Sequence, residues 1–294
     1  MTHLLPDFKF DERIISMTPQ FVDPMIGIDP MTNMSYYRTN AFGIDCSRWQ
    51  DDNSTPQKMD FKKAYAAGAR FAFIKASQAC WMDEDFTYNW KSAKEAGLLR
   101  RAFHFMDWTE SGYDQAMFFC GLLKKDPGEI DPAIDYECRN KGGKEIYEIP
   151  NFRYGQAVPQ LRSFCDVLLK EFNLPAIYTG QWYWKNFGSE DEYYKQLQLW
   201  LAYVDGGWPA PAIIPKPWDY ASWVQFTWTL DGKKYGAESD GLDGNWFNGT
   251  LEELYTLYGL PEVEVTDTGT GYGEISEWNN ALDAVIDCVE KLTR

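Results

Sequence analysis

The chain has little of what a metal centre or a basic binding surface needs. It contains only two histidines in 294 residues, His3 and His104, which argues against a site built on several imidazole ligands. Its 28 Lys and Arg stand against 44 Asp and Glu, and the net charge is −16. Because binding to phosphates needs clustered basic residues, this balance argues against a nucleic-acid partner. We therefore expect no metal, no cofactor and no nucleic acid.

Long apolar runs and targeting signals are also missing. No run of 18 or more consecutive apolar residues occurs, so we expect no membrane-spanning segment. The first residues, MTHLLPDFKFDERIISM, do not follow the signal-peptide pattern of a basic stretch before an apolar core. The six cysteines show no C-x-x-C spacing, which favours free thiols in a reducing compartment. These features predict synthesis in a cytoplasm without a signal peptide.

Apolar and aromatic residues, by contrast, are plentiful. Hydrophobic residues make up 45% of the chain, which is enough for a large core and excludes global disorder. Aromatic residues reach 17%, and an excess of Trp and Tyr often lines a groove, since their polar tips need partners. The length fits one large α/β barrel or two ordinary domains.

Strand-like and helix-like segments alternate from residue 41 onward. Short β-rich runs are expected at 42–46, 70–76, 102–106, 133–137, 176–179, 199–204, 222–227 and 241–246. Helices are expected at 61–67, 85–96, 113–124 and 154–172. Such alternation implies parallel strands with right-handed crossovers, and about eight strands suit a closed barrel better than an open sheet. Short loops between the late strands predict an irregular second half.

The two ends of the chain differ from this pattern. Residues 1–40 lack clean periodicity, and we expect an N-terminal extension packed against the main domain at 41–260. A polar, Gly- and Thr-rich linker follows at 261–275. Residues 276–294 carry apolar side chains at three- and four-residue spacing, which predicts an amphipathic helix. This helix either docks on the barrel or self-associates and makes the protein a homo-oligomer.

One predicted strand ends with two acids. Positions i and i+2 of a strand face the same way, so Asp135 and Glu137 point together. Two carboxylates this close repel by about 2–3 kcal/mol at an effective dielectric near 20, which is about two pKa units. One acid can therefore stay protonated while the other is ionised. Glycoside cleavage needs this division, with an acid for the leaving oxygen and an anion facing the oxocarbenium-like centre.

Two more acids are expected at the same opening. Asp45 ends the first predicted strand and Asp243 ends the last, and these two strands are neighbours in a closed barrel. Catalytic groups collect at the C-terminal ends of barrel strands. A D-x-E pair alone fits structural ion pairing as well as catalysis, but four acids around one opening favour catalysis.

Nine short motifs, in order, resemble the family 25 glycoside hydrolases, the Chalaropsis-type lysozymes of fungi, bacteria and bacteriophages. They are G-I-D-C-S at 43–47 with W-Q at 49–50, F-I-K-A-S at 73–77, D-x-x-Y-N at 85–89 with A-G-L at 96–98, F-H-F at 103–105, I-D-Y-E at 134–137, Y-T at 178–179, L-W-L-A-Y at 199–203, V-Q-F at 224–226 and L-D-x-N at 242–245. Residues 1–40 and the tail after Leu260 lie outside the resemblance.

The resemblance implies a TIM-like, irregular (β/α)5β3 barrel that cleaves the β-1,4 bond between N-acetylmuramic acid and N-acetylglucosamine in bacterial peptidoglycan. Glu137 would be the general acid and base. Asp135 would either attack the anomeric carbon or steady an oxazolinium formed by the substrate's acetamido group. Asp45 and Asp243 would line the floor of the substrate-binding cleft. Six further residues are candidate substrate contacts, each also compatible with a packing role: Lys75, His104, Tyr178, Trp200, Tyr203 and Gln225.

Two departures and two rival interpretations accompany the resemblance. Gln78-Ala79 stands where many members have Glu-Gly, and Val224 stands where Trp is common. A chitinase-like family 18 barrel would need D-x-D-x-E, which Ala133 breaks. The other rival is an inactive glycan-binding or virion structural protein on the same barrel, against which the four acids argue. Without a signal-peptide pattern, we expect a bacteriophage endolysin, made in the host cytoplasm and acting on the wall after release.

Overall fold

The computed structural model describes residues 40–51, 54–55, 57–137, 157–204 and 214–261, and two short paired strands, β1 (Gly27–Ile28) and β2 (Ser35–Tyr36). The chain divides into two compact units, Met1–Leu260 and Pro261–Arg294. The predicted linker and the helix at 276–294 lie outside the described residues, as does most of the predicted extension at 1–40.

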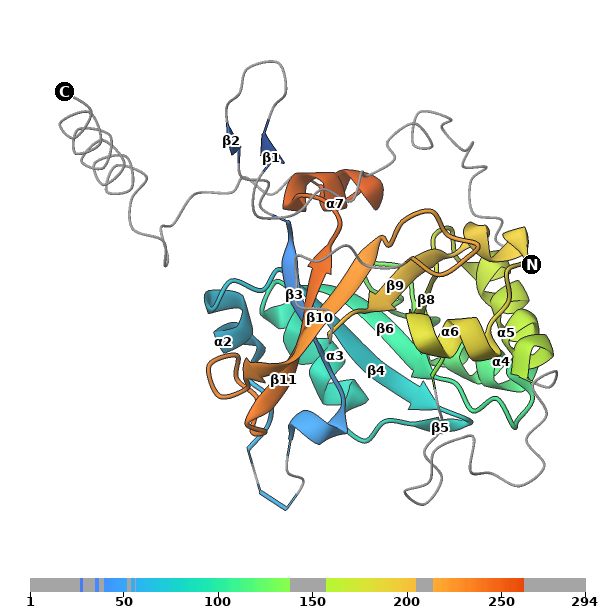
Figure 1. Cartoon of the computed structure of the whole chain (residues 1–294). Helices are drawn as coiled ribbons and strands as arrows, with labels where there is room; N and C mark the ends of the chain where they lie inside the picture. Colours follow the sequence, from blue (N-terminus) through green and yellow to red (C-terminus); the bar gives the residue numbers. More distant parts are fainter. Residues whose placement is uncertain are drawn as a thin grey trace, which may run out of the picture. The chain divides into compact units, whose positions relative to one another are not determined.

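Eight strands close into a barrel, which Figure 1 shows with helices packed outside it. In chain order they are β3 (Phe42–Cys46), β4 (Phe71–Gln78), β6 (Leu99–Phe105), β7 (Ala133–Asp135), β8 (Ala176–Gly180), β9 (Gln198–Ala202), β10 (Trp223–Asp231) and β11 (Gly241–Phe247). Pairing of β3 with β4 completes the ring. The short β5 (Trp81–Met82) folds back on β4. The predicted closed α/β barrel is confirmed.

One strand runs against the others. Neighbouring strands from β3 through β4 and β6 to β10 pair in parallel, but β11 is antiparallel to both β10 and β3. The expectation of parallel strands is therefore wrong for β11. The loop at 232–240 is too short for the crossover that a parallel pair requires, so β10 and β11 form a hairpin.

A helix follows each of the first five barrel strands. These helices are α2 (Phe61–Ala66), α3 (Phe86–Glu95), α4 (Gly112–Leu123), α5 (Ala157–Glu171) and α6 (Gln181–Phe187). Side-chain caps begin two of them: Asp60 accepts from the first backbone N–H groups of α2, and Ser111 accepts from Asp114 N. Gly68 and Gly97 follow α2 and α3 at positive φ, as helix C-caps do. Helices α2 to α5 lie close to the four predicted positions, and α6 was not predicted.

Alternating side chains divide the strands between two cores. One set packs outward against the helices, and the other fills the barrel. Inside, the rings of Phe73, Trp200 and Trp223 meet edge to face at 4.7–5.1 Å. Helix α7 (Leu251–Leu257) adds the buried Leu254 to this inner core and closes the end where the parallel strands begin. The interior is therefore filled at that end, and space is left at the C-terminal ends of the strands.

Candidate active site

A cavity of about 250 Å³ opens at the C-terminal ends of the parallel strands. All four acids predicted to meet at one opening line it. The full lining consists of Asp45, Cys46, Ser47, Trp49, Gln50, Lys75, Phe103, Phe105, Asp135, Glu137, Tyr178, Trp200, Gln225 and Asp243.

Strand alternation places Asp135 and Glu137 on the cavity side. Asp135 is the last residue of β7, and Glu137 follows two positions later. The residues between and before them, Tyr136 and Ile134, are fully buried in the outer core. The Tyr136 hydroxyl donates to the carbonyl of Phe187 at 2.8 Å, which anchors this strand end to α6. Both carboxyl groups therefore face the same space, as their spacing predicts.

Asp45 reaches the cavity from the neighbouring strand β3. Gly43 lies two residues earlier on the same face, where an added Cβ would come within 2.3 Å of the Phe71 ring. Glycine at this position lets Phe71 fill the layer beneath Asp45. The G-I-D motif therefore combines a close packing contact with an acid directly above it.

Asp243 reaches the same space by a different route from the one expected. It does not end its strand but lies near the start of β11, directly opposite Asp45 in the antiparallel ladder. Because β11 runs antiparallel, its beginning lies at the end of the barrel where β3 finishes. The predicted position at the opening agrees with the structure, whereas the strand-end argument for it was wrong.

The Asp135 and Glu137 carboxyls both bind protons more tightly than free carboxyls do. Burial raises the pKa of Glu137 to about 7; the charge of Asp45 raises it as well, and that of Lys75 opposes the shift. Burial and then the charge of Glu137 hold the pKa of Asp135 well above its usual range. Its Oδ1 is buried and has no hydrogen-bond partner among the described residues. The cavity therefore holds a transferable proton near neutral pH.

Asp45 and Asp243 share hydrogen bonds with an amide network. Gln225 Nε2 donates to Asp45 Oδ2 at 3.0 Å and to Asp243 Oδ2 at 3.1 Å, and Asn245 Nδ2 donates to Asp45 Oδ2 at 2.7 Å. Burial and the charge of Asp45 raise the pKa of Asp243 to about 8. Burial also raises the pKa of Asp45, but its hydrogen bonds lower it. The hydrogen bond between the two acids lowers the pKa of Asp45 and raises that of Asp243, so Asp243 is the member of the pair that holds the proton near neutral pH.

Lys75 brings a positive charge to the acids. Its side chain is buried, and Nζ donates to Gln78 Oε1 at 2.9 Å and lies 4.8 Å from the centre of the Phe105 ring. Burial lowers the pKa of Lys75, and the charge of Asp135 opposes that shift. Lys75 thus offsets part of the negative charge that the carboxyl groups would otherwise concentrate.

His104 is absent from the cavity lining, so of the two roles that the sequence left open for it the structure shows the packing role. On β6 the side chains of Phe103 and Phe105 face the cavity, so alternation turns His104 outward. Its ring is fully buried, 2.8 Å from Ser77 Oγ through Nδ1 and 3.1 Å from Gln115 Oε1 through Nε2. Burial lowers the pKa of His104 to about 3, so the ring is neutral. Its role in this structure is to satisfy polar groups of the outer core.

Tyr203 is also absent from the cavity lining. It follows β9 directly, and because Trp200 and Ala202 face inward, Tyr203 packs against the outer core. Its backbone N–H extends the ladder by donating to the carbonyl of Gln225 at 2.9 Å. The other predicted contacts, Tyr178, Trp200 and Gln225, all line the cavity.

Several lining residues were not predicted as site residues. Strand alternation applied to F-H-F could have identified Phe103 and Phe105. The two phenylalanines share one face of the strand, and His104 lies on the other. Trp49 belongs to the quoted W-Q motif, but its 69% exposure depends on the turn that carries it, which the sequence pattern did not indicate. Asn245 lies outside the lining but supports it: it stands in L-D-x-N, and only the strand pairing shows that its side chain reaches Asp45.

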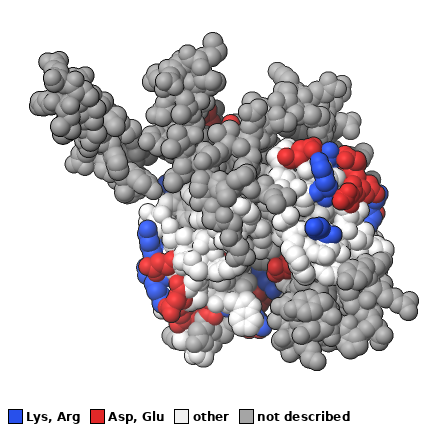
Figure 2. Space-filling model, viewed as in Figure 1, with Lys and Arg blue, Asp and Glu red and all other residues white. Residues whose placement is uncertain are grey.

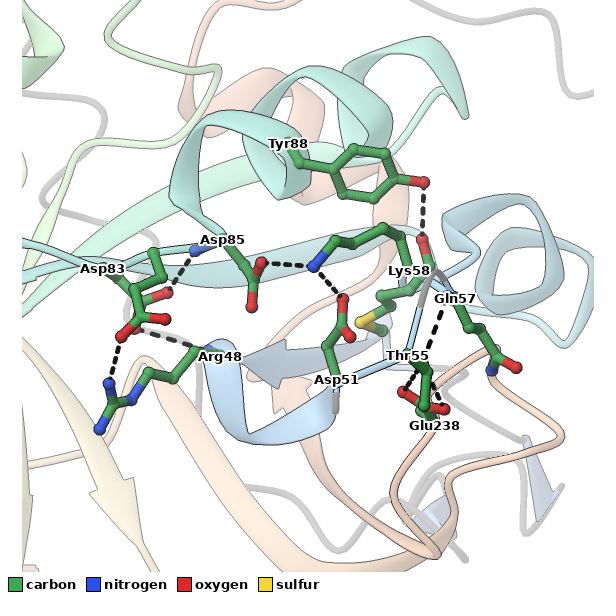
Figure 3. Close-up of polar contacts among 11 residues, drawn as sticks. Arg48, Asp51, Thr55, Gln57, Lys58, Asp83, Asp85, Tyr88 and Glu238 are labelled. Carbon is green, nitrogen blue, oxygen red and sulfur yellow. Dashed lines mark hydrogen bonds and ion pairs between the residues drawn. The ribbon is translucent and has the colours of Figure 1, made fainter. Parts of the chain in front are cut away.

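The turn that carries Trp49 is fixed to the start of α3. It is a 3₁₀ helix, η1 (Arg48–Gln50), closed by a capping box between Ser47 and Gln50. Figure 3 shows Lys58 between Asp51 and Asp85, and its Nζ lies 3.0 Å from a carboxylate oxygen of each. Asp51 follows η1 and Asp85 directly precedes α3, so this bridge holds the rim of the cavity in place.

The described residues show little that would indicate a nucleic-acid, metal or membrane site. In Figure 2 acidic and basic side chains lie next to one another on the face in view, with no large basic patch among the described residues. No cluster of three or more His, Cys, Asp or Glu suited to a metal ion occurs in the described part of the chain. Among the same residues, no helix has the length and apolar character to cross a membrane.

Known proteins are similar to this chain over most of the barrel. Residues 44–237 match the family described as glycosyl hydrolases family 25. The chain is similar to lysozyme M1 of Streptomyces globisporus, with 26% identity over 226 residues, 73% of this chain and 70% of that protein. It is also similar to the N,O-diacetylmuramidase of Arthroderma benhamiae, with 25% identity covering 72% of this chain and 84% of that protein.

A solved structure agrees with these sequence matches. The muramidase from Trichobolus zukalii superposes with a TM-score of 0.58 at 25% identity, covering 74% of this chain and 98% of that one. The family match spans most of the barrel and includes Asp45, Asp135 and Glu137. With the family's barrel and its acids gathered at one open end, the chain belongs to glycosyl hydrolases family 25 and is a glycoside hydrolase.

Proposed function

We propose that the protein is a muramidase, which hydrolyses the β-1,4 bond between N-acetylmuramic acid and N-acetylglucosamine in bacterial peptidoglycan. The observation that carries the proposal is the cavity in which Glu137, with a pKa raised to about 7, lies with Asp135 and Asp45. The names of the two relatives, lysozyme and N,O-diacetylmuramidase, support the choice of bond.

In this proposal Glu137 is the general acid. It protonates the leaving glycosidic oxygen and then removes a proton from the incoming water. Its pKa of about 7 suits both steps, because the group can hold a proton and also give it up near neutral pH.

Asp135 is proposed to contact the sugar at the reaction centre. Its buried Oδ1 has no partner among the described residues and faces the same space as Glu137, so a bound sugar would supply the missing contact. Lys75, Tyr178, Trp200 and Gln225 line the same space and are proposed as further substrate contacts. The tyrosine and tryptophan rings are suited to stack on a sugar face.

The proposal is tested by Glu137→Gln, which keeps the shape of the side chain but removes the transferable proton. We expect it to reduce lysis of purified cell walls by at least about a thousandfold, since it removes the proton donor from the transition state. The matched control is Glu110→Gln, a change of the same kind at an exposed residue outside the cavity lining. Full activity of a folded Glu137→Gln variant would contradict the assignment.

An inactive glycan-binding protein on the same barrel is the competing function. An inactive barrel has no need to keep protons on buried acids, whereas this cavity retains four carboxyl groups and the cation Lys75. Wild-type protein that binds walls but releases no fragments would favour the inactive alternative.

A further inference from the structure

Two side-chain amides converge on a single oxygen of Asp45. Asn245 Nδ2 lies 2.7 Å from Asp45 Oδ2, and Gln225 Nε2 lies 3.0 Å from the same atom. The three side chains are all buried and come from adjacent strands, β3, β11 and β10, in which Gln225 is paired with Asn245. One carboxylate oxygen therefore receives two N–H donors inside the barrel.

The orientation of both amides is determined by their outer partners. An indole N–H can only donate, and Trp200 Nε1 lies 2.8 Å from Asn245 Oδ1. The carbonyl oxygen of Asn245 must therefore face Trp200, and its NH₂ group must face Asp45. The Tyr178 hydroxyl donates to Gln225 Oε1 at 2.8 Å, which turns the NH₂ group of Gln225 toward the acids in the same way.

We propose that Asn245 and Gln225 are positioning residues that hold Asp45 as an anion at the cavity wall, from where its charge keeps the proton on Glu137. The proposal rests on the proposed muramidase function, in which Glu137 donates that proton. It concerns a step before catalysis, namely how Glu137 keeps its proton until the substrate is bound. Asn245 is absent from the cavity lining, so its influence has to pass through Asp45.

The electrostatics of the cavity agree with this arrangement. Hydrogen bonds donated to a carboxylate favour its charged form and oppose the effect of burial. Burial raises the pKa of Asp45, while the bonds from Asn245, Gln225 and Asp243 lower it, in that order. After burial, the charge of Asp45 is the largest cause of the raised pKa of Glu137.

Other charged and titratable groups on the neighbouring strands interact with Glu137 or Asp45. Lys75 on β4 lowers the pKa of Glu137 and so opposes Asp45. The charge of Asp45 in turn raises the pKa values of Asp135 on β7, the Tyr178 hydroxyl on β8 and the adjacent Cys46 thiol on β3. Asp243 on β11 holds a proton and hydrogen-bonds Asp45.

The test is direct titration of the Glu137 carboxyl by ¹³C NMR, with glutamate labelled and the Glu137 signal assigned from its loss in Glu137→Gln. Asn245→Leu keeps similar volume but has no N–H donor. We expect it to lower the midpoint of the Glu137 titration by about half to one pH unit, a three- to tenfold loss of proton affinity. Because the readout is a titration, it gives an answer even if the protein cleaves some other glycan.

Two further variants keep the test decisive if Asn245→Leu does not fold. Gln225→Met removes the other amide and is expected to lower the same midpoint. Asp45→Asn removes the charge itself and should lower the midpoint at least as far. In the double variant Asp45→Asn with Gln225→Met, the second change should then add nothing, since both act through one charge.

Asn248→Leu is the matched control. Asn248 is also a buried asparagine next to β11, and its Nδ2 donates to the carbonyl of Ala221 at 2.9 Å. Its loss should lower the free energy of unfolding without moving the Glu137 titration. An unchanged or raised Glu137 midpoint in folded Asn245→Leu or Gln225→Met would overturn the proposal, as would a shift equal to that of Asn248→Leu.

Discussion

Four carboxyl groups in one cavity cannot titrate as independent acids. Burial penalises each charge, and every ionised neighbour makes the next ionisation harder. Burial raises the pKa of Asp45 and the amide donors oppose that rise, whereas the pKa values of Glu137 and Asp243 rise to about 7 and 8. At the residue scale, the division of labour among identical functional groups therefore comes from their hydrogen bonds and neighbours.

The first prediction concerns the pH dependence of hydrolysis. Glu137 must carry a proton to donate it, so activity is present below its pKa and lost as the pH rises through about 7. We expect kcat/KM on cell walls to fall roughly tenfold per pH unit well above this value. Initial rates between pH 5 and 9 at constant ionic strength measure it. Activity that increases from pH 7 to 9 would be incompatible with Glu137 as the acid.

The second prediction concerns stability and Asp243. A carboxyl whose pKa rises on folding contributes stability that is present below its ordinary pKa of 3.8 and lost as the pH rises through about 8. Asp243→Asn cannot lose this contribution, because it carries no charge at any of these pH values. We expect the variant to be more stable than the wild type by about 1–2 kcal/mol at pH 8.5, with a smaller difference at pH 5.

Urea unfolding at the two pH values measures this difference. The larger gain must occur at pH 8.5. The difference in free energy of unfolding between Asp243→Asn and the wild type is compared at the two pH values. A smaller gain at pH 8.5 than at pH 5 would show that Asp243 is ionised without cost in the folded protein.

At the element scale, a short turn decides what lies at the rim. The 3₁₀ helix η1 carries Trp49, whose ring is 69% exposed although it lines the cavity. The ion pairs of Lys58 with Asp51 and Asp85 hold the turn against the start of α3 (Figure 3). The exposed Trp49 indole lies on a turn that ion pairs hold in place, so it can stack on a sugar ring with little loss of conformational freedom.

The third prediction follows from this rim. Trp49→Ala should raise KM for cell walls about three- to tenfold and leave kcat within about twofold, because it removes a contact that is made before and during the reaction alike. Tyr65→Ala is the control, since Tyr65 is 40% exposed on α2, away from the cavity. Equal KM values for the two variants would rule out the stacking role.

The barrel itself was predictable from periodicity, because strands and helices impose different spacings on apolar residues. Alternation also predicted the shared face of Asp135 and Glu137. It failed where tertiary pairing decides direction: only the short hairpin before β11 shows why Asp243 lies at the opening. For His104 the sequence left substrate contact and packing both open, and the structure shows packing, because the flanking phenylalanines occupy the interior positions of β6.

The amide contacts to Asp45 illustrate a different kind of limit. Asn245 and Asp45 are two hundred positions apart, and their contact depends on the register of β11 against β3. A one-residue slip in that register would turn Asn245 to the outer core. Sequence spacing alone therefore predicted which strands carry acids, but not which side chains support them.

At the scale of the whole molecule, the barrel has one filled end and one open end. Aromatic rings and α7 fill the end where the parallel strands begin, and the acids occupy the other. Charge is mixed on the surface in view (Figure 2), although the chain carries a net charge of −16. Local contacts at the open end must therefore provide binding to an anionic wall, with longer-range repulsion screened by salt.

The fourth prediction concerns the segment after the barrel. We expect the amphipathic pattern at 276–294 to form a helix that docks or self-associates. If it self-associates, a chain ending at Pro261 will have half the light-scattering mass per particle of the full chain. An unchanged mass per particle, after correction for the missing residues, would rule out a dimer held by this segment.

The central claim is that the carboxyl groups around Glu137 cleave one particular glycosidic bond. Mass spectrometry of the fragments released from purified peptidoglycan tests it most directly, after borohydride reduction of the new ends and with Glu137→Gln as the blank. We predict reduced N-acetylmuramic acid at the new ends from the wild-type protein and none from the blank. Reduced N-acetylglucosamine at those ends, or equal release by the blank, would contradict the claim.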